Sequence, residues 1–79
     1  MPYVKPRLRD ILDEGGQPQS TGELNYLFTK LIQWYLDGHV NYDKINAVVG
    51  ALDCAKMEFY RRVAVPYEEK KREENGDVY

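Results

Sequence analysis

Apolar residues recur at helical spacing along two stretches of the chain. In the first stretch they fall three or four positions apart: Leu24, Leu27, Phe28, Leu31, Ile32, Tyr35 and Leu36. This spacing places them on one face of an amphipathic helix. Ser20 and Glu23 have the spacing of a capping box, and Gly38 suits the position just after a helix. The pattern therefore predicts a helix over residues 20–37.

A second apolar stripe predicts a longer helix over residues 41–65. Its members are Ile45, Val48, Val49, Leu52, Ala55, Phe59 and Val63. Asn41 is a favourable N-cap for this helix. Because the turn before it is short, we expect the two helices to pack antiparallel as a hairpin. The longer helix also carries a stripe of small residues that lets another helix approach closely: Ala47, Gly50, Ala51 and Cys54.

Shorter elements are expected on either side of the hairpin. A short helix can follow Pro6, and the Gly15–Gly16 pair ends it. Pro66 is expected to break or kink the long helix. The predicted fold is a single all-α domain, a helical hairpin with a short N-terminal element and a Pro-kinked C-terminal extension. Its parts are an N-terminal arm and variable loop, two helices, a charged C-terminal helix and a tail: residues 1–19, 20–37, 41–65, 66–75 and 76–79.

The size of the chain favours self-association. A domain of 79 residues buries only about 60% of its unfolded surface, so its core is marginal. One cysteine and one histidine provide neither an internal disulfide nor a structural zinc site. The longer helix also outruns the first by about 10 Å. We therefore expect a homo-oligomeric bundle without metal or cofactor, with these interface residues: Ala47, Gly50, Ala51, Cys54, Tyr26 and Trp34.

Charge and hydropathy restrict the partners further. The 11 basic and 13 acidic residues give a net charge of −2, which offers no broad basic surface for long nucleic acid. No apolar run approaches the roughly 20 residues of a membrane span, and the start of the chain lacks the apolar stretch of a signal peptide. A single unpaired cysteine is typical of the cytoplasm. We expect a cytoplasmic protein that binds neither membranes nor long nucleic acid.

Three stretches make up most of the chain from Gly22 onward: GELNYLFTKLIQWYL (22–36), NYDKINAVVGALDCAKMEFYRRV (41–63) and PYEEKKREENGDVY (66–79). They resemble a family of short uncharacterised proteins found in tailed phages and prophages. The opening MPY also matches, and the segments EFYRRV and ENGDVY are the most specific. The resemblance implies a mobile-element origin and a role in the cytoplasm of an infected host cell. It implies no established activity.

Catalytic chemistry has little support in the sequence. His39 lies beside a glycine in a turn, and Cys54 has no histidine at helical spacing to act as its base. The Glu68–Glu69 and Glu73–Glu74 pairs lie in a charge run that offers no desolvation to raise a carboxyl pKa. We do not expect an enzyme.

An anion-binding site has more support. Tyrosine beside arginine suits a phosphate with a stacked base, because the guanidinium forks onto the phosphate and the ring stacks on the base. Glu58 offers a structural alternative, since it lies three and four residues before the two arginines and can neutralise them along the helix. The candidate ligand-binding residues are Arg61, Arg62, Tyr60, Tyr67 and Lys30.

Two functions follow as hypotheses. The first is the binding of a small anionic ligand between subunits, and in the phage-like context this ligand could be a nucleotide signal of host defence that the protein sequesters. The second is a protein–protein interaction module, an adaptor or inhibitor of host or phage machinery. The seven tyrosines favour the second, because tyrosine is enriched at protein interfaces.

Overall fold

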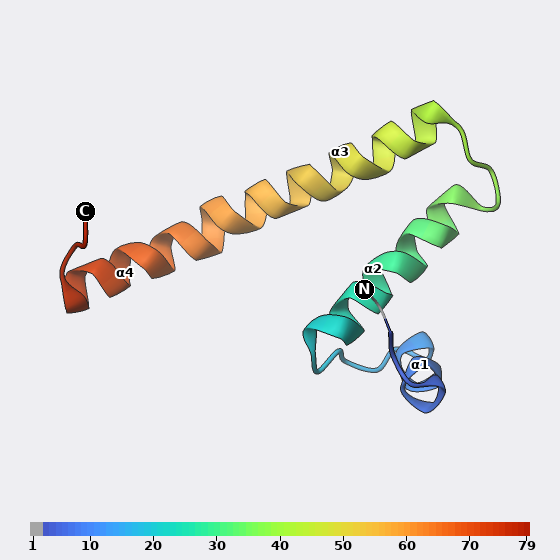
Figure 1. The fold of residues 1–79 in the computed structure, drawn as a ribbon, viewed down its shortest axis with the longest axis horizontal. Helices are drawn as coiled ribbons and strands as arrows, with labels where there is room; N and C mark the ends of the chain where they lie inside the picture. Colours follow the sequence, from blue (N-terminus) through green and yellow to red (C-terminus); the bar gives the residue numbers. More distant parts are fainter. Residues whose placement is uncertain (1–2) are drawn as a thin grey trace. The chain divides into compact units, whose positions relative to one another are not determined.

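The computed structural model describes residues 3–79, so the first two residues of the predicted N-terminal arm lie outside it. All secondary-structure elements in the described residues are helices and none is a strand, which confirms the predicted all-α class. Internal contacts divide the chain into two units that meet in sequence between Val40 and Asn41. In chain order the elements are α1 (Pro6–Asp13), α2 (Thr21–Leu36), α3 (Tyr42–Phe59), the π-helical turn η1 (Tyr60–Ala64) and α4 (Val65–Asn75) (Figure 1).

The N-terminal unit is built by the packing of α1 against α2. Leu12 from α1 and Tyr26 from α2 are its buried side chains, with 3% and 7% of their surface exposed. The Tyr26 hydroxyl donates a hydrogen bond to Asp13 Oδ1 at 2.8 Å. A small apolar contact and one hydrogen bond between side chains therefore fix α1 on α2.

The Gly15–Gly16 pair ends α1, as the sequence predicts. The Gly15 amide donates to the Leu12 carbonyl at 3.0 Å, and the Gly16 amide donates to the Ile11 carbonyl at 2.9 Å. These two bonds form a Schellman motif, and Gly15 adopts the left-handed φ of 98° that the motif requires. A Cβ at Gly16 would lie 2.8 Å from the backbone carbonyl oxygen of Ile11 and 2.6 Å from Ile11 Cγ2, so this position also demands glycine.

Helix α2 begins and ends within one residue of its predicted range. The Glu23 amide donates to Ser20 Oγ at 3.1 Å, which is the first half of the capping box. The Glu23 carboxylate accepts from the Gln19 amide at 3.2 Å, one residue before the expected partner. At the other end Asp37 and Gly38 both have left-handed backbone, with φ of 50° and 77°.

The second unit is one continuous helical run through α3, η1 and α4 (Figure 1). Asn41 caps it as predicted, because its side chain accepts from the Lys44 amide at 2.8 Å. The backbone stays in the right-handed helical region at Phe59, at the start of η1, and at Val65, at its end. The run therefore continues to Asn75.

Pro66 was expected to break or kink the long helix, and the structure shows no break there. Proline lacks an amide hydrogen, and in an α-helix its ring clashes with the carbonyl four residues earlier. The chain meets this constraint by widening the preceding turn, where the Val65 amide donates to the Tyr60 carbonyl five residues back. Such an i→i+5 turn is a π-helix, and it lets the helix pass through Pro66.

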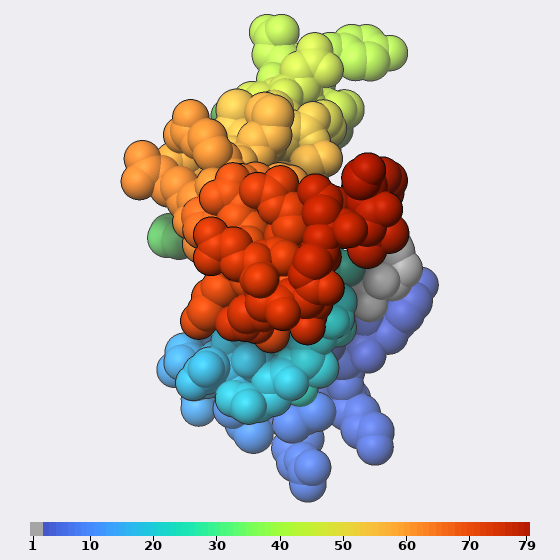
Figure 2. Space-filling view, turned by 90° about the vertical axis from the view of Figure 1, so that its left-hand side faces the viewer, coloured from blue at the N-terminus to red at the C-terminus, as the bar shows by residue number. Residues whose placement is uncertain are grey.

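The C-terminal tail turns back beside α4. Gly76 has a φ of 85° that ends the helix, and its amide donates to the Arg72 carbonyl at 2.8 Å. Asp77 then accepts from the Tyr79 amide at 2.9 Å and lies 3.9 Å from Arg72 Nη1. The tail has the darkest red colour in Figure 2.

Candidate functional site

The π turn carries three of the five predicted ligand-binding residues. Tyr60, Arg61 and Arg62 are consecutive in η1. Arg61 Nη2 lies 2.7 Å from Glu58 Oε2, and Arg62 Nε donates to the other oxygen of the same carboxylate. Two guanidinium groups on neighbouring residues thus converge on one anionic group.

These ion pairs are the structural alternative that the sequence left open. Each arginine side chain keeps 71% of its surface exposed, and Glu58 keeps 49%. Exposed pairs of this kind contribute about 0–1 kcal/mol to stability, so they hold the arginines loosely. One carboxylate against two guanidinium groups also leaves one net positive charge. The pairs orient the arginines without neutralising the cluster.

The other two predicted ligand residues have different surroundings. Tyr67 follows in α4, and the Lys71 ammonium lies 5.6 Å from the centroid of its ring. Lys30 belongs to the N-terminal unit, where its ammonium lies 6.0 Å from the centroid of the Tyr26 ring. The structure therefore groups Tyr60, Arg61 and Arg62 in one turn, with Tyr67 one to two turns later.

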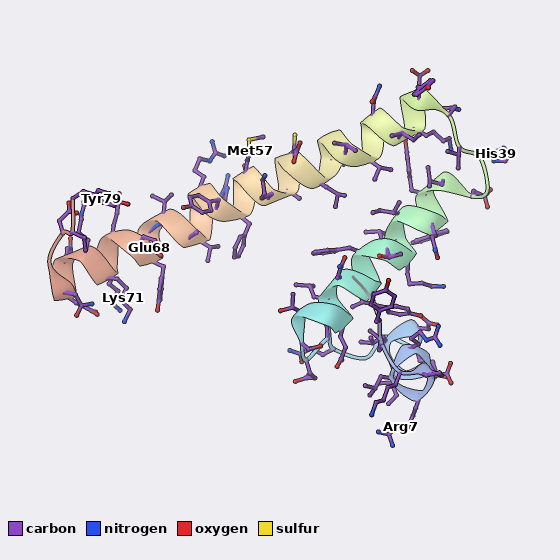
Figure 3. All side chains as sticks on the ribbon, in the orientation of Figure 1. Arg7, His39, Met57, Glu68, Lys71 and Tyr79 are labelled. Carbon is purple, nitrogen blue, oxygen red and sulfur yellow. The ribbon has the colours of Figure 1, made fainter. Side chains whose placement is uncertain are left out.

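Sequence reasoning did not find the open hollow between α4 and the C-terminal tail, which has a volume of about 640 Å³. Figure 3 labels three of its residues, Glu68, Lys71 and Tyr79. Its lining mixes acidic and basic groups, so the hollow has no preference for anions, and Arg61 and Arg62 do not line it. One aromatic residue from η1 and five charged residues contribute to it: Tyr60, Glu68, Glu69, Lys71, Arg72 and Asp77. The Asn75–Gly76 pair is the sequence feature that could have indicated this hollow, because the chain turns back there.

Tyr26 does not lie on an outer face, contrary to the prediction that made it an interface residue. Its side chain is buried against α1, and the Asp13 carboxylate accepts its hydroxyl hydrogen. Desolvation raises the pKa of Tyr26 above its ordinary value, and the hydrogen bond and negative charge of Asp13 raise it further. Periodicity within α2 could not reveal this burial, because the covering element is α1.

The remaining predicted interface residues are exposed. Trp34 keeps 79% of its surface exposed. Cys54 is a free, exposed thiol. A Cβ at Gly50 would meet no atom within 4 Å, so nothing in the unit uses the space that this glycine leaves. Ala47 and Ala51 are exposed on the same helix. All of these positions are accessible to a partner.

Residues 3–79 contain neither a cluster of metal-binding side chains nor a membrane-spanning helix. No cluster of three or more histidine, cysteine or acidic side chains that could hold a metal ion occurs there. In the same part of the chain, no helix combines the length and the apolar character needed to span a membrane. His39 is exposed in the segment between α2 and α3.

Comparison with known proteins gives a family and no closer relative. No curated protein matches the chain, and no solved structure matches it either. One family does match, over residues 1–78, which is nearly the whole sequence, and it is described as a domain of unknown function. On this match, the chain belongs to the family DUF6899.

Proposed function

We propose that the protein is a non-enzymatic helical binding protein that holds a small anionic ligand at η1. The observation that carries the proposal is the convergence of Arg61 and Arg62 on the single carboxylate of Glu58. A phosphate group presents oxygens in a similar arrangement and is also negatively charged, so it would compete for the same two guanidinium groups. Glu58 occupies the position that such a ligand would take.

Tyr67 favours a phosphate ester with an aromatic base. It is 57% exposed, so it can offer a ring face for stacking. Tyr60 comes two residues after Glu58, on the other side of the helix, and does not contribute to this site. The phage-type context implied by the sequence resemblance makes nucleotide signals of host defence the first ligands to test. Sequestration of such a signal in the host cytoplasm is the role that we propose.

Calorimetric titration of the full chain with cyclic dinucleotides and ADP-ribose tests this proposal. We expect one ligand to bind, and Arg61→Ala to weaken it by about 10-fold or more because one guanidinium fork is lost. Arg7→Ala, which removes an exposed arginine from the N-terminal unit, serves as the control and should leave the affinity unchanged.

Glu58→Gln gives a second, opposite test of the same site. The amide keeps the shape of the carboxylate and loses its charge, so the two guanidinium groups lose their internal competitor. We expect the ligand to bind about 3-fold to 10-fold more tightly, which matches the modest strength of exposed ion pairs. Absence of binding to every ligand tested, in both the wild-type chain and this variant, contradicts the proposal.

A protein-interaction module is the second candidate, and the exposed apolar face of α2 favours it. Four residues of its predicted stripe are 44–60% exposed: Leu24, Phe28, Leu31 and Tyr35. Contiguous exposed apolar surface is typical of interaction sites. In the hairpin expected from the short α2–α3 connection, this face would pack against the long helix of the same chain. An adaptor would present it to another protein.

A pull-down with the full chain tests the adaptor. Capture of a partner that Leu31→Glu abolishes would support it, and a pull-down that returns only the protein itself contradicts it.

A further inference from the structure

A row of apolar side chains follows the long helix through α3, η1 and α4. We refer to it as the long-helix stripe: Ile45, Val49, Leu52, Phe59, Val63 and Tyr67. The exposed fractions of these six residues range from 42% at Leu52 to 62% at Phe59. None of the residues of α3, η1 or α4 is buried within the unit. The stripe is therefore an apolar surface without a partner inside the second unit.

The π turn extends the stripe past Pro66. Phe59 and Tyr67 are eight residues apart, which in a regular α-helix leaves them offset by about 80° around the axis. The turn at η1 contains one residue more than an α-helical turn. With that extra residue, eight positions make close to two full turns. Tyr67 consequently comes into line with Phe59, and the apolar row continues into α4.

No other helix within residues 3–79 is long enough to cover this row. From Ile45 to Tyr67 the stripe spans roughly 33 Å at 1.5 Å per residue. Helix α2 has 16 residues and reaches about 24 Å, and α1 has 8 residues and reaches about 12 Å. Wherever α2 packs, about a quarter of the stripe extends beyond it. A matching length is found in a second copy of the same long helix.

The charges around the stripe allow two copies of it to meet. Lys56 lies on the stripe between Leu52 and Phe59, and its ammonium points to Asp53 at 3.8 Å, so its stem can cover apolar surface. The arginines beside Val63 are paired with Glu58. Lys56 has its own counter-charge on the same helix, and the two arginines share one. Two identical faces therefore meet with most of their positive charge compensated, and each copy keeps one net positive charge beside Val63.

We propose that the long-helix stripe is a self-association surface on which the long helix of a second copy packs. The same residues would face each other in both copies, as in the two-fold interfaces of most homodimers. Phe59 lies between the two ends of the row and has the largest exposed fraction in it. It is the residue expected to dominate the interface.

Sedimentation velocity of the full chain over a range of micromolar concentrations tests the proposal. The wild-type chain is expected to sediment with twice its mass of 9.3 kDa. Phe59→Glu should weaken the association by at least about 100-fold, since it places a charge in each copy at the centre of the interface. Far-UV circular dichroism checks that the variant keeps its helical content.

Met57→Glu is the matched control. Met57 is similarly exposed, at 58%, and lies two residues before Phe59, which places it about 200° away around the helix axis. This variant should associate like the wild-type chain. A wild-type monomer at all concentrations overturns the proposal, whether α2 or another protein covers the stripe. Equal loss of association in both variants also overturns it. The ligand-binding proposal is read out separately, through Arg61.

Discussion

At the scale of single residues, Tyr26 shows how a second element changes the meaning of a side chain. Within α2 it lies outside the main apolar stripe, so the sequence alone placed it at an outer surface. The short helix α1 covers that side, and Asp13, its last residue, accepts a hydrogen bond from the Tyr26 hydroxyl. Tyr26 is therefore part of the core of the N-terminal unit.

The Tyr26–Asp13 contact predicts a loss of stability in alkali. The pKa of Tyr26 in the folded chain is raised above the ordinary 10.0, so folding favours the neutral phenol. This contribution is complete below pH 10.0 and is lost as the pH rises through the folded value, where the tyrosinate would face the Asp13 carboxylate. Urea unfolding at increasing pH measures the effect.

Tyr26→Phe provides the comparison for that measurement. The variant lacks the titrating hydroxyl, so its unfolding free energy should fall less steeply above pH 10.0 than that of the wild-type chain. Tyr42→Phe removes a hydroxyl from a residue that is 84% exposed and should keep the wild-type dependence. Identical pH profiles for Tyr26→Phe and the wild-type chain would show that the contact does not couple to folding.

At the scale of helices, the starts that depend on one capping side chain could be predicted from the sequence. The continuation of the long helix through Pro66 could not. Ser20 and Asn41 begin their helices as the sequence indicated, because a cap needs only its own side chain and the next three residues. Pro66 was expected to break or kink the long helix, and the helix continues through it. The widened turn before it accommodates the proline ring, and the helix-breaking propensity of proline does not predict that outcome.

The candidate site was predictable to a similar extent. The cluster of Tyr60, Arg61 and Arg62 and its pairing with Glu58 follow from residue spacing, and the structure contains both. The hollow beside the tail was missed, because it depends on where Asp77 and Tyr79 lie after the chain reverses at Gly76. Helical periodicity does not predict contacts between a helix and a tail that turns back beside it.

Replacing Pro66 should change the π turn that precedes it. Pro66→Ala restores an amide hydrogen and removes the ring, so η1 should relax towards a regular α-helix. Because proline costs about 3 kcal/mol relative to alanine inside a helix and the wide turn relieves part of that cost, we expect stabilisation of roughly 1–2 kcal/mol. Slower amide hydrogen exchange across residues 60–67 measures the change. Unaltered exchange there would mean that Pro66 does not maintain the wide turn.

At the scale of the whole molecule, the buried core is very small for a folded protein. Over residues 3–79 it consists of Leu12 and Tyr26, both in the N-terminal unit. Isolated helices are marginal in water, and most helical stability in proteins comes from the packing of an apolar face. If a second copy packs on the long-helix stripe as proposed, it supplies most of the stability of that helix.

A concentration-dependent melting temperature follows from that view. If two copies stabilise each other, mass action makes the folded dimer more resistant to heat as the protein concentration rises. We expect the midpoint of thermal unfolding, followed by circular dichroism, to increase by several degrees per 100-fold rise in concentration. Phe59→Glu should melt at a lower temperature that does not change with concentration. A constant midpoint for the wild-type chain would indicate that each copy folds alone.

The exposed thiol on α3 has a practical consequence. Cys54 is the single cysteine of the chain, so a nitroxide spin label attached there marks one known position without any mutation. Pulsed electron resonance between two labelled copies would then report the separation of their α3 helices directly. A parallel pair of helices brings the two labels close together, and an antiparallel pair places them according to how far Cys54 lies from the centre of the overlap.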